Sequence, residues 1–440
     1  MALPVCAIFD IGKTNKKFFL VDEDYNIRYT ASKNCIEIKD EDGVLCDDID
    51  IMTQWIKDIL FEKLKDESFN IVALNFSTYG ASFVHISKHG YPIAPLYNYL
   101  KPFPEDIEKK FYSTYGDKKQ IAVETASPAL GMLNSGLQLY WLKYARPEVF
   151  AQTKVSLHLP QYLAYLFHGK QLSDITSIGC HTKLWNFEKN EYHSWVIAEA
   201  MDRQLASLFG SDEVLHTEIN GKEVLCGVGL HDSSAAFIPY IQSIKEPFIL
   251  ISTGTWCITM NPFNTTPLTP EELEQDCLCY MTYKGTPLKA SRLFAGYEHE
   301  QETKKMAAHF KTDSNYFTKV KYDAELVSTK DGIAGAGDGF KCENYASYEN
   351  AYHQFISYLV KQQKKSSDLV LNNCGAKKIF VDGGFAKNDI YMNLLAKVYP
   401  GHEVYAASVS QASALGAALA IHEHWNSKAL PEDLIRVKRY

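Results

Sequence analysis

Short apolar runs separated by polar turns open the chain, and this alternation predicts a meander of three strands. The runs are CAIFDI (6–11), KKFFLVD (16–22) and IRYTAS (27–32), with the turns GKTN and EDYN between them. The pattern changes to helical spacing over residues 48–61, where Ile51, Trp55 and Ile59 recur on one face. NIVALNFS (70–77) then has the composition of a buried strand.

Two further helices are predicted in the first half, and each ends at a residue that stops helices. GMLNSGLQLYWLKYARPEVF (131–150) should stop near Arg146-Pro147, because proline cannot continue the ladder of backbone hydrogen bonds. HLPQYLAYLFHG (158–169) should end at Gly169, since glycine takes the left-handed conformation that is common at helix ends.

The second half repeats the plan of the opening without repeating its residues. FILISTGTWCITMN (248–261) runs strand, polar turn, strand, and it follows an Ala-rich helix that starts near residue 232. The later predicted elements are a strand that runs into a Gly-Gly turn (377–388), a helix (389–400), a strand (403–408) and an Ala-rich helix (412–425). We place a domain boundary near 242–246, which gives one unit of residues 1–242 and another of 243–440.

The composition of the chain limits the classes of protein to which it can belong. A chain of 440 residues with 46% hydrophobic and 22% charged residues is typical of a globular protein with more than one domain. Its net charge of -8 disfavours nucleic acid or an anionic membrane as a partner. No apolar run approaches the ~20 residues that span a bilayer, and the start lacks the basic region of a signal peptide. The ten scattered cysteines indicate free thiols, so we expect a cytoplasmic protein.

The first turn contains Gly12-Lys13-Thr14, which resembles part of a nucleotide-triphosphate loop. That loop needs a glycine five positions earlier and a helix after it, so that backbone N–H groups cradle the phosphates. The earlier position is Ala7, and the residues that follow predict a strand. The triphosphate-loop interpretation therefore fails on both counts.

A hairpin turn that binds phosphate is the alternative. Exposed backbone N–H groups in a tight turn form an anion site, to which Thr14 and Asn15 add donors and Lys16 or Lys17 adds charge. Asp10 would repel phosphate directly, but it can hold Mg²⁺ through waters. An ordinary hairpin with a capping aspartate is the simpler interpretation of these residues, and the hairpin by itself does not decide between them.

Ser252-Thr253-Gly254-Thr255 favours the phosphate-binding interpretation, because it supplies a second turn of the same kind in the second half. Two such turns can face each other across a cleft. Asp382-Gly383-Gly384 also follows a predicted strand, and its glycines let the backbone approach a flat ligand. It lacks the G-x-G-x-x-G spacing of nicotinamide-cofactor sites, so we predict an adenine or ribose site there, with Asn388.

Asp232 lies between the two turns in GLHDSSA, at the start of a predicted helix. The helix dipole favours an ionised carboxylate at this end, and an ionised carboxylate can accept the proton of an attacking hydroxyl. Phosphoryl transfer needs only modest help of this kind, because positioning and charge neutralisation supply most of the rate. A simple helix-capping role explains the residue equally well.

Together these motifs resemble the FGGY family of carbohydrate kinases, within the actin–hexokinase–heat-shock ATPase superfamily. The motifs are D-x-G-x-T-N, GLHDSSAA, STGTW, DGGFAKN and ALGAALA, and they follow the family order over nearly the whole chain. LNSGLQLYWLKY is similar to the family's signature helix, with Gln138 where lysine is usual. The resemblance implies an α/β fold of two ribonuclease-H-like domains of the actin/hexokinase type, with a cleft that closes over ATP, Mg²⁺ and a sugar.

The resemblance also implies roles for residues. Asp232 is the expected base and Asp10 the expected metal residue. The expected phosphate residues are Thr14, Asn15, Lys16, Thr253, Gly254 and Thr255, and the expected adenosine residues are Gly383, Gly384 and Asn388. The implied partner is a small-molecule sugar, and family members are frequently homodimers.

Two details are similar to L-rhamnulose and L-fuculose kinases, which implies phosphorylation of the terminal C1 hydroxyl of a ketose. One is His231 before the aspartate, and the other is STYGASFV (77–84). The sugar residues expected from them are Thr78, Tyr79, Gly80, Ser82, His231 and Asp232. The departures are Ser82 for aspartate, Tyr97-Asn98-Tyr99 for a basic segment, Phe385 for glycine and Gln411 for glutamate. The sugar therefore stays open, because one hydrogen bond can change selectivity by orders of magnitude.

Other functions share some of these features. Xylulose, ribulose and glycerol kinases are alternatives within the family. A nucleotide-binding switch of the chaperone or actin type would share both turns, but it would not need residues 77–84 or Asp232. A sugar sensor without catalysis is a third alternative, which the presence of both Asp10 and Asp232 disfavours.

Overall fold

The structure is a computed structural model that describes residues 2–34, 36–327, 340–371 and 374–440. Its first half is built on a mixed sheet with the strand order β13-β14-β6-β1-β2-β3, and β15 also pairs with β6. β1, β2 and β3 form the predicted antiparallel meander, and β6 lies parallel to β1. The strands are β1 Leu3–Ile11, β2 Lys16–Asp22, β3 Ile27–Lys33, β6 Phe69–Thr78, β13 Val214–Ile219, β14 Lys222–Gly227 and β15 Leu230–His231.

The second half is built on a sheet with the order β18-β19-β17-β16-β20-β21-β22. β16, β17 and β19 form an antiparallel meander, and β20 lies parallel to β16. This is the plan of the first sheet again, and it confirms the expected fold of two ribonuclease-H-like units. The strands are β16 Phe248–Thr253, β17 Cys257–Asn261, β18 Cys277–Met281, β19 Pro287–Leu293, β20 Lys378–Gly383, β21 Glu403–Ser408 and β22 Arg436–Arg439.

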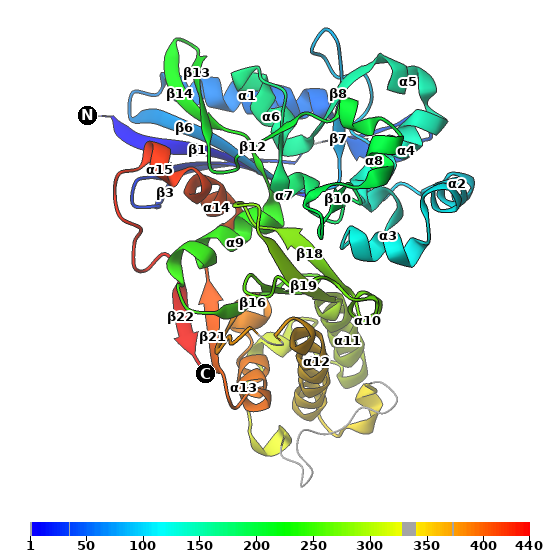
Figure 1. Ribbon diagram of the computed structural model, residues 1–440. Coiled ribbons are helices and arrows are strands. Elements are labelled where there is room, and N and C mark those ends of the chain that lie inside the picture. The colour runs from blue at the N-terminus through cyan, green and yellow to red at the C-terminus, as the bar shows by residue number, and fades with distance from the viewer. Residues whose placement is uncertain (1, 35, 328–339, 372–373) are drawn as a thin grey trace.

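Helices cover the sheets and build a further lobe on the first one (Figure 1). The helices of the first half are α1 Ile49–Lys65, α2 Glu105–Tyr115, α3 Lys118–Glu124, α4 Ser135–Ala145, α5 Pro147–Gln152, α6 Leu159–His168, α7 Ile175–Ile178, α8 Ser194–Ala198 and α9 Asp232–Ser243. Those of the second half are α10 Pro270–Glu274, α11 Ala295–Phe310, α12 Tyr348–Leu371, α13 Asp389–Val398, α14 Ala412–Ala420 and α15 His422–Trp425. Short strands in the lobe and its edges are β4 Glu37–Lys39, β5 Leu45–Asp47, β7 Phe83–Ser87, β8 Thr153–His158, β9 Leu172–Asp174, β10 Trp185–Asn186, β11 Glu191–Tyr192 and β12 Ser207–Phe209.

Most predicted helices are confirmed, with two differences. The stretch 131–150 does not form one helix, because α4 starts at Ser135 after a short 3-10 turn, and Pro147 starts α5 as its first residue. Proline is well suited to that position, where its missing N–H leaves no helical bond unmade. The Ala-rich helix 412–425 is interrupted at Ile421 and divides into α14 and α15. α6 ends as expected at Gly169, which has φ 71°.

α9 and α14 lie between the two sheets, at the centre of the molecule (Figure 1). A single apolar core surrounds them and combines residues of both halves, among them Ile8 and Phe248. Asn75 Nδ2 donates to Ala417 O at 2.8 Å, so α14 of the second half is bound to β6 of the first. α9 ends at Ser243 and β16 begins at Phe248. We keep residues 1–242 and 243–440 as the proposed division into domains.

Two expectations from composition can be compared with the structure. The described cysteines are free thiols, as predicted, while Cys35 lies outside the described residues. Within the described ranges, no helix combines the length and the apolar character that crossing a bilayer requires.

Candidate active site

The opening hairpin brings its polar turn to one end of the first sheet. Gly12 N donates to Asn15 O at 2.9 Å across the turn, and Thr14 and Asn15 are exposed at its tip. β2 follows the turn directly. Because a strand and not a helix comes next, the structure agrees with the rejection of a triphosphate loop.

The two lysines after this turn face opposite sides of the sheet. Lys16 is buried, and its Nζ lies 2.9 Å from Asp47 Oδ1 and 2.8 Å from Lys13 O. Lys17 Nζ instead donates to Gln411 Oε1 at 3.0 Å, on the side of the cleft. Successive residues of a strand alternate between its two faces, so only one of the pair can reach the phosphate site. Lys16, which was expected at phosphate, is thus bound within the protein in this structure, and we propose Lys17 for that role.

Asp10 lies near the end of β1, opposite Lys17 on β2 and Ser77 on β6. Burial raises the pKa of its carboxyl to about 6, and the charge of Asp232 acts in the same direction. Ser413, Lys17 and Ser77 act on this pKa in the opposite direction. Asp10 thus belongs to a polar cluster that also includes Asp232 and a serine of the second half.

Asp232 is the first residue of α9, and about a third of its side chain (34%) is exposed. Its Oδ1 accepts from Ser233 N at 2.6 Å and lies 3.2 Å from His231 Nε2. Burial raises the pKa of the carboxyl to about 6, although the bonds from Ser233 oppose the rise. A carboxyl with this pKa is ionised at neutral pH, and it binds a proton more readily than an ordinary aspartate does.

Helix capping does not explain Asp232. The N-cap of α9 is His231, and no side-chain cap bond is formed at this end. A capping aspartate would precede the helix and accept from the second or third N–H after it. Asp232 accepts from the adjacent Ser233 N and leaves its other carboxylate oxygen for the cleft.

Sheet pairing places the expected sugar segment beside Asp232. β15 pairs with β6 so that His231 is opposite Thr78, which brings residues 77–84 against the start of α9. Gly80 packs on the His231 ring so closely that an added Cβ would lie 2.7 Å from His231 Cδ2. A larger residue at this position would displace the ring, so the close approach explains the glycine.

The hydroxyl groups of the same segment bond to the protein. Thr78 Oγ1 donates to Tyr79 O at 2.9 Å, and Tyr79 OH donates to Asp47 Oδ2 at 2.8 Å. Ser82 is buried, and its Oγ donates to Tyr97 O at 3.3 Å. These three side chains therefore shape the wall of the site in this structure, while Gly80, His231 and Asp232 lie together.

Three residues near Asp232 escaped the sequence analysis, and a fourth, Tyr99, entered it only as part of a departure from the family pattern. Cys180 Sγ lies 3.4 Å from His231 Nε2, and the rings of His181 and Tyr280 lie within 6.1 Å of the His231 ring. The charge of Asp232 also contributes to the raised pKa of Tyr99, after burial. Tyr280 comes from β18 of the second sheet. No local pattern marks these residues, because they gather through contacts between segments far apart in the sequence.

Thr253 joins the second polar turn to the Gly-Gly turn. Its Oγ1 donates to Asp382 O at 2.5 Å and accepts from Phe385 N at 3.0 Å, while its backbone O accepts from Gly384 N at 2.9 Å. The Thr253 hydroxyl, which was expected to bind phosphate, thus forms its hydrogen bonds within the protein. Gly254 and the next residue, Thr255, form the exposed part of this turn.

Close approaches explain two glycines at this junction. Gly383 has φ +90°, and a Cβ there would lie 2.0 Å from Thr253 O. Gly296, at the start of α11, packs on the second turn so tightly that a Cβ would lie 1.8 Å from Gly254 O. Gly383 was expected from the sequence, but Gly296 was not.

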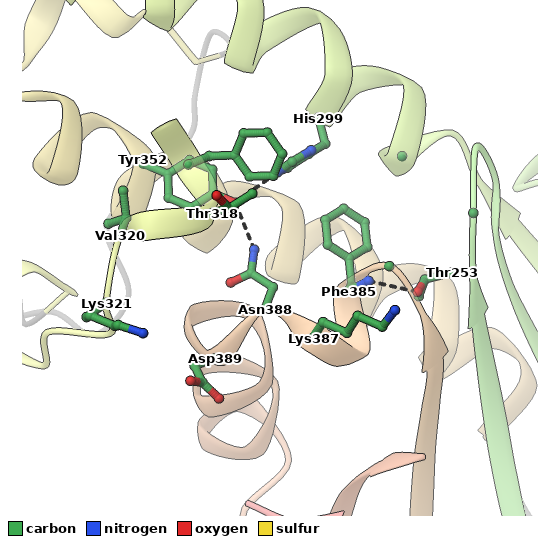
Figure 2. Close-up of a pocket in the computed structure, with 14 residues that line it drawn as sticks. Thr253, His299, Thr318, Val320, Lys321, Tyr352, Phe385, Lys387, Asn388 and Asp389 are labelled. Carbon is green, nitrogen blue, oxygen red and sulfur yellow. Dashed lines mark hydrogen bonds between the residues drawn. The ribbon is translucent and has the colours of Figure 1, made fainter. Parts of the chain in front are cut away.

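A pocket of about 590 Å³ opens beside this junction (Figure 2). Gly254, Gly296 and Gly384 form one side of it, and Phe317 to Lys321 lie on another. Asn388 Nδ2 donates to Tyr352 OH at 2.8 Å, and Tyr352 OH lies 2.9 Å from His299 Nε2. The volume and the mixed aromatic and polar lining suit a nucleoside.

A smaller cavity of about 240 Å³ extends from the second turn toward Asp232. Its lining combines Asp232 and Ser233 of α9 with Ser252, Asp382 and Ser413 of the second half. Asp232, Asp382 and the second polar turn therefore adjoin the nucleoside-sized pocket.

Comparison with known protein families identifies the family to which the chain belongs. Residues 5–233 match the N-terminal domain of the FGGY family of carbohydrate kinases. Residues 245–331 and 346–429 match the carbohydrate kinase FGGY C-terminal domain. The chain belongs to the FGGY carbohydrate kinase family. This confirms the resemblance that the motifs indicated.

Curated relatives of this FGGY chain include two rhamnulokinases. The one from Halalkalibacterium halodurans is 25% identical over 182 residues, which cover 40% of this chain and 37% of the relative. The one from Oceanobacillus iheyensis is 23% identical over 227 residues, which cover 50% of this chain and 47% of the relative. The matched regions thus span less than half the length of either relative.

Solved structures of similar fold cover nearly the whole FGGY chain. A carbohydrate kinase from Novosphingobium aromaticivorans has a TM-score of 0.81 at 22% identity, covering 100% of this chain and 94% of its own. A ligand-bound xylulose kinase from Lactobacillus acidophilus has a TM-score of 0.80 at 16% identity, with the same coverage. Plasmodium falciparum glycerol kinase with ADP has a TM-score of 0.73 at 14% identity, covering 97% and 91%. At these identities the likeness concerns the fold.

Proposed function

We propose that this protein transfers the γ-phosphoryl group of ATP to a hydroxyl of a ketose, with Asp232 as the general base. One observation carries the proposal. Asp232 lines the smaller cavity together with Ser413, and Ser413 in turn contacts Asp10, so both carboxyls lie at one cleft; burial raises the pKa of each to about 6. That cleft lies between the nucleoside-sized pocket and the wall formed by Gly80 and His231.

The proposed nucleotide site is the pocket of Figure 2. Gly296 and Gly384 allow the backbone to approach a flat base, and Asn388 with Tyr352 offers polar contacts to the adenosine. Gly383 supports this site by its φ of +90°. The phosphates would then extend past Gly254 and Thr255 toward the opening hairpin, where Thr14, Asn15 and Lys17 lie.

The proposed reaction is a direct transfer. The sugar hydroxyl oxygen attacks the γ-phosphorus, and the bond from that phosphorus to the β–γ bridging oxygen breaks as the new bond forms. The hydroxyl proton passes to the Asp232 carboxylate, and ADP leaves with the electron pair. The pKa near 6 keeps Asp232 ionised before the transfer and makes it a competent proton acceptor.

Mg²⁺ fits the surroundings of Asp10. The carboxylate of Asp10 and the nearby hydroxyl groups of Ser77 and Ser413 are oxygen donors, which this hard cation prefers. Asp10 would hold the ion, directly or through waters, beside the phosphates. The bound ion would neutralise phosphate charge during transfer.

For the sugar, we propose L-rhamnulose, L-fuculose or a related deoxyketose or pentulose, phosphorylated at the terminal C1 hydroxyl. His231 before the base and the names of the two curated relatives support this choice. The segment 77–84 also lies beside the base, as a sugar-binding segment must. Xylulose, ribulose and glycerol remain the alternatives, since kinases named for xylulose and glycerol share the fold.

The test is ATP-dependent phosphorylation across a panel of ketoses and polyols, compared between the wild type and Asp232→Asn. We expect one deoxyketose or pentulose to dominate. We expect the variant to lose about 10²–10⁴-fold in kcat, which is the usual contribution of a general base. Asp58→Asn is the matched control, because Asp58 is an exposed acid on α1 that bonds to Gln54.

Two results would contradict the proposal. Full activity in Asp232→Asn would exclude it as the base. Stabilisation of the protein by both ATP and a sugar, without any phosphorylated product, would instead indicate a sensor or nucleotide switch.

A further inference from the structure

Beside Asp232 lies a group of side chains that combines His231 of the proposed sugar site with Cys180 and His181, to which the proposed reaction gives no role. Among the residues that the structure describes, Cys180, His181 and His231 form a cluster whose ligand-type atoms all lie within 4.8 Å of one another. Thiolate and imidazole are the donors that zinc prefers in proteins. The cluster belongs to the first half of the chain, and its thiol and imidazole donors differ from the oxygen donors proposed to hold Mg²⁺ at Asp10.

Two segments distant in sequence hold the cluster together. Asp174 caps α7, accepting from Thr176 N and Ser177 N, and so fixes the helix that leads to Cys180. His231 N donates to Thr176 Oγ1 at 3.0 Å, which ties the other segment to the same helix. Hydrogen bonds within and between these two segments therefore hold the cluster in place.

The orientation of His181 suits a ligand. Its Nδ1 lies 3.3 Å from Leu133 O, so this nitrogen is the N–H donor and Nε2 carries the lone pair. Histidines that bind metals usually donate their second ring N–H to a backbone carbonyl or carboxylate in this way. The backbone of His181 is also specialised, with φ 40° in the left-handed region.

Asp232 lies beside the cluster, next to His231, and is not a member of it. Zn²⁺ bonds of about 2.0–2.3 Å in a tetrahedron need ligand atoms about 3–4 Å apart. Cys180 Sγ lies 3.4 Å from His231 Nε2, and His231 Nε2 lies 3.2 Å from Asp232 Oδ1. Cys180 and His231 are almost fully buried, whereas 34% of the Asp232 side chain is exposed. An ion can therefore reach the cluster from the cleft.

We propose that Cys180, His181 and His231 bind Zn²⁺, with solvent from the cleft as the fourth ligand. Coordination requires the Cys180 thiol to release its proton to solvent. Mg²⁺ does not compete here, because it prefers oxygen donors in an octahedral arrangement. Zn²⁺ on His231 places positive charge beside the Asp232 carboxylate, whose Oδ1 lies 3.2 Å from His231 Nε2. This charge lowers the affinity of the carboxylate for a proton, so Zn²⁺ inhibits phosphoryl transfer. This last consequence rests on the proposed function of Asp232, whereas the binding itself does not.

Binding is measured on the full chain in millimolar Mg²⁺, by equilibrium dialysis with Zn²⁺ and by absorption after addition of Co²⁺. We expect one ion per chain, and a thiolate-to-cobalt charge-transfer band with the strong visible bands of a tetrahedral site. Cys180→Ser should lose the charge-transfer band. It should also bind Zn²⁺ at least about tenfold more weakly, since even outer partners of metal ligands contribute that much.

His181→Asn is the second variant, because asparagine tolerates the left-handed backbone at this position and supplies no imidazole. It should also weaken Zn²⁺ binding at least about tenfold. Cys374→Ser is the control, since Cys374 is a partly exposed thiol outside the cluster, and it should bind like the wild type. Substoichiometric binding by the wild type, or unchanged binding by both cluster variants, would overturn the proposal.

A separate assay tests inhibition. Micromolar Zn²⁺ should lower turnover of the best sugar in the wild type and in Cys374→Ser, and a chelator should restore it. Stoichiometric binding without any inhibition would refute the effect of the ion on Asp232. If no sugar is turned over at all, the kinase proposal fails, while the dialysis and cobalt measurements still decide whether the metal site exists.

Discussion

Burial raises the pKa of both Asp10 and Asp232, although the two residues come from different segments. Each carboxyl has a pKa near 6, compared with 3.8 for an ordinary aspartate, because removal from water disfavours the charged form. Phosphates and Mg²⁺ would meet a cleft in which one carboxylate can carry a metal and the other a proton. At both residues, the removal of water from around the carboxyl affects the pKa more than any single neighbouring group does.

The raised pKa predicts how activity depends on pH. Asp232 can accept a proton only when ionised, so activity is full above its pKa and declines below it. We expect kcat/KM for the sugar to fall about tenfold for each pH unit below about 6. A pH–rate profile between pH 4.5 and 8 measures this. A profile that stays flat down to pH 4.5 would show that no group with this pKa controls the reaction.

The two lysines after the first turn predict a contrast between stability and binding. Lys16→Met removes the buried ammonium that pairs with Asp47, which keeps Lys13 and Tyr79 as partners, and it should lower the free energy of unfolding by about 3 kcal/mol. Lys17→Met removes a cleft-side charge, so it should leave stability almost unchanged and raise KM for ATP about tenfold. Urea unfolding and steady-state kinetics separate the two effects. The opposite result, with KM for ATP raised in Lys16→Met and unchanged in Lys17→Met, would return the phosphate role to Lys16.

α9 and α14 form the element pair on which the site depends. α9 carries Asp232 at its first residue, and α14 crosses it at Gly416, where an added Cβ would lie 1.7 Å from Ala235 O. Helices approach this closely only where one residue lacks a side chain. The position of the base is therefore set by a glycine on a helix of the other half.

Gly416→Ala should separate these helices. Overpacking against backbone atoms costs about 3 kcal/mol of stability, and a shift of about 1 Å at Asp232 can cost about 10²-fold in kcat. Thermal unfolding and turnover measure both effects. Gly401→Ala is the control, because a Cβ at Gly401 meets nothing within 4 Å. Wild-type turnover in Gly416→Ala would show that the crossing does not position the base.

At the scale of the whole molecule, the two halves are connected through shared contacts as well as through the cleft. Asn75 binds Ala417 O, and Tyr25 OH lies 2.6 Å from His422 Nδ1. Both contacts lie near α14. We therefore expect any movement of the two halves toward each other, on ligand binding, to occur about this region. The homodimer implied by the family resemblance stays a prediction.

Ligands that bind each half should therefore stabilise the protein separately and together. A non-hydrolysable ATP analogue with Mg²⁺ should add about 2.7 kcal/mol at a hundred times its Kd, and the preferred sugar should do the same. The two together should stabilise more than either alone, as measured by thermal unfolding. Asp232→Asn should keep the shift with the ATP analogue, because the base does not line the nucleoside pocket. Absence of any nucleotide shift would contradict the assignment of that pocket.

The sequence by itself determined the elements and the order of the motifs. Strand alternation, helical periodicity and turn residues are local signals, so β2 and β21 match their predicted stretches and α6 ends at Gly169. Asp10 and Asp232 could be found because each stands at the junction of a strand or helix with a turn. The family resemblance then assigned them roles that local patterns alone left open.

Only the tertiary structure decided which side chains meet. Lys16 turns to Asp47, far along the chain, and Thr253 uses its hydroxyl within the protein. Cys180 and Tyr280 reach His231 through the packing of separate segments. Such contacts depend on sheet register and on the approach of the two halves, which no short stretch of sequence encodes. The pKa values follow from the same packing, because burial is a property of the assembled fold.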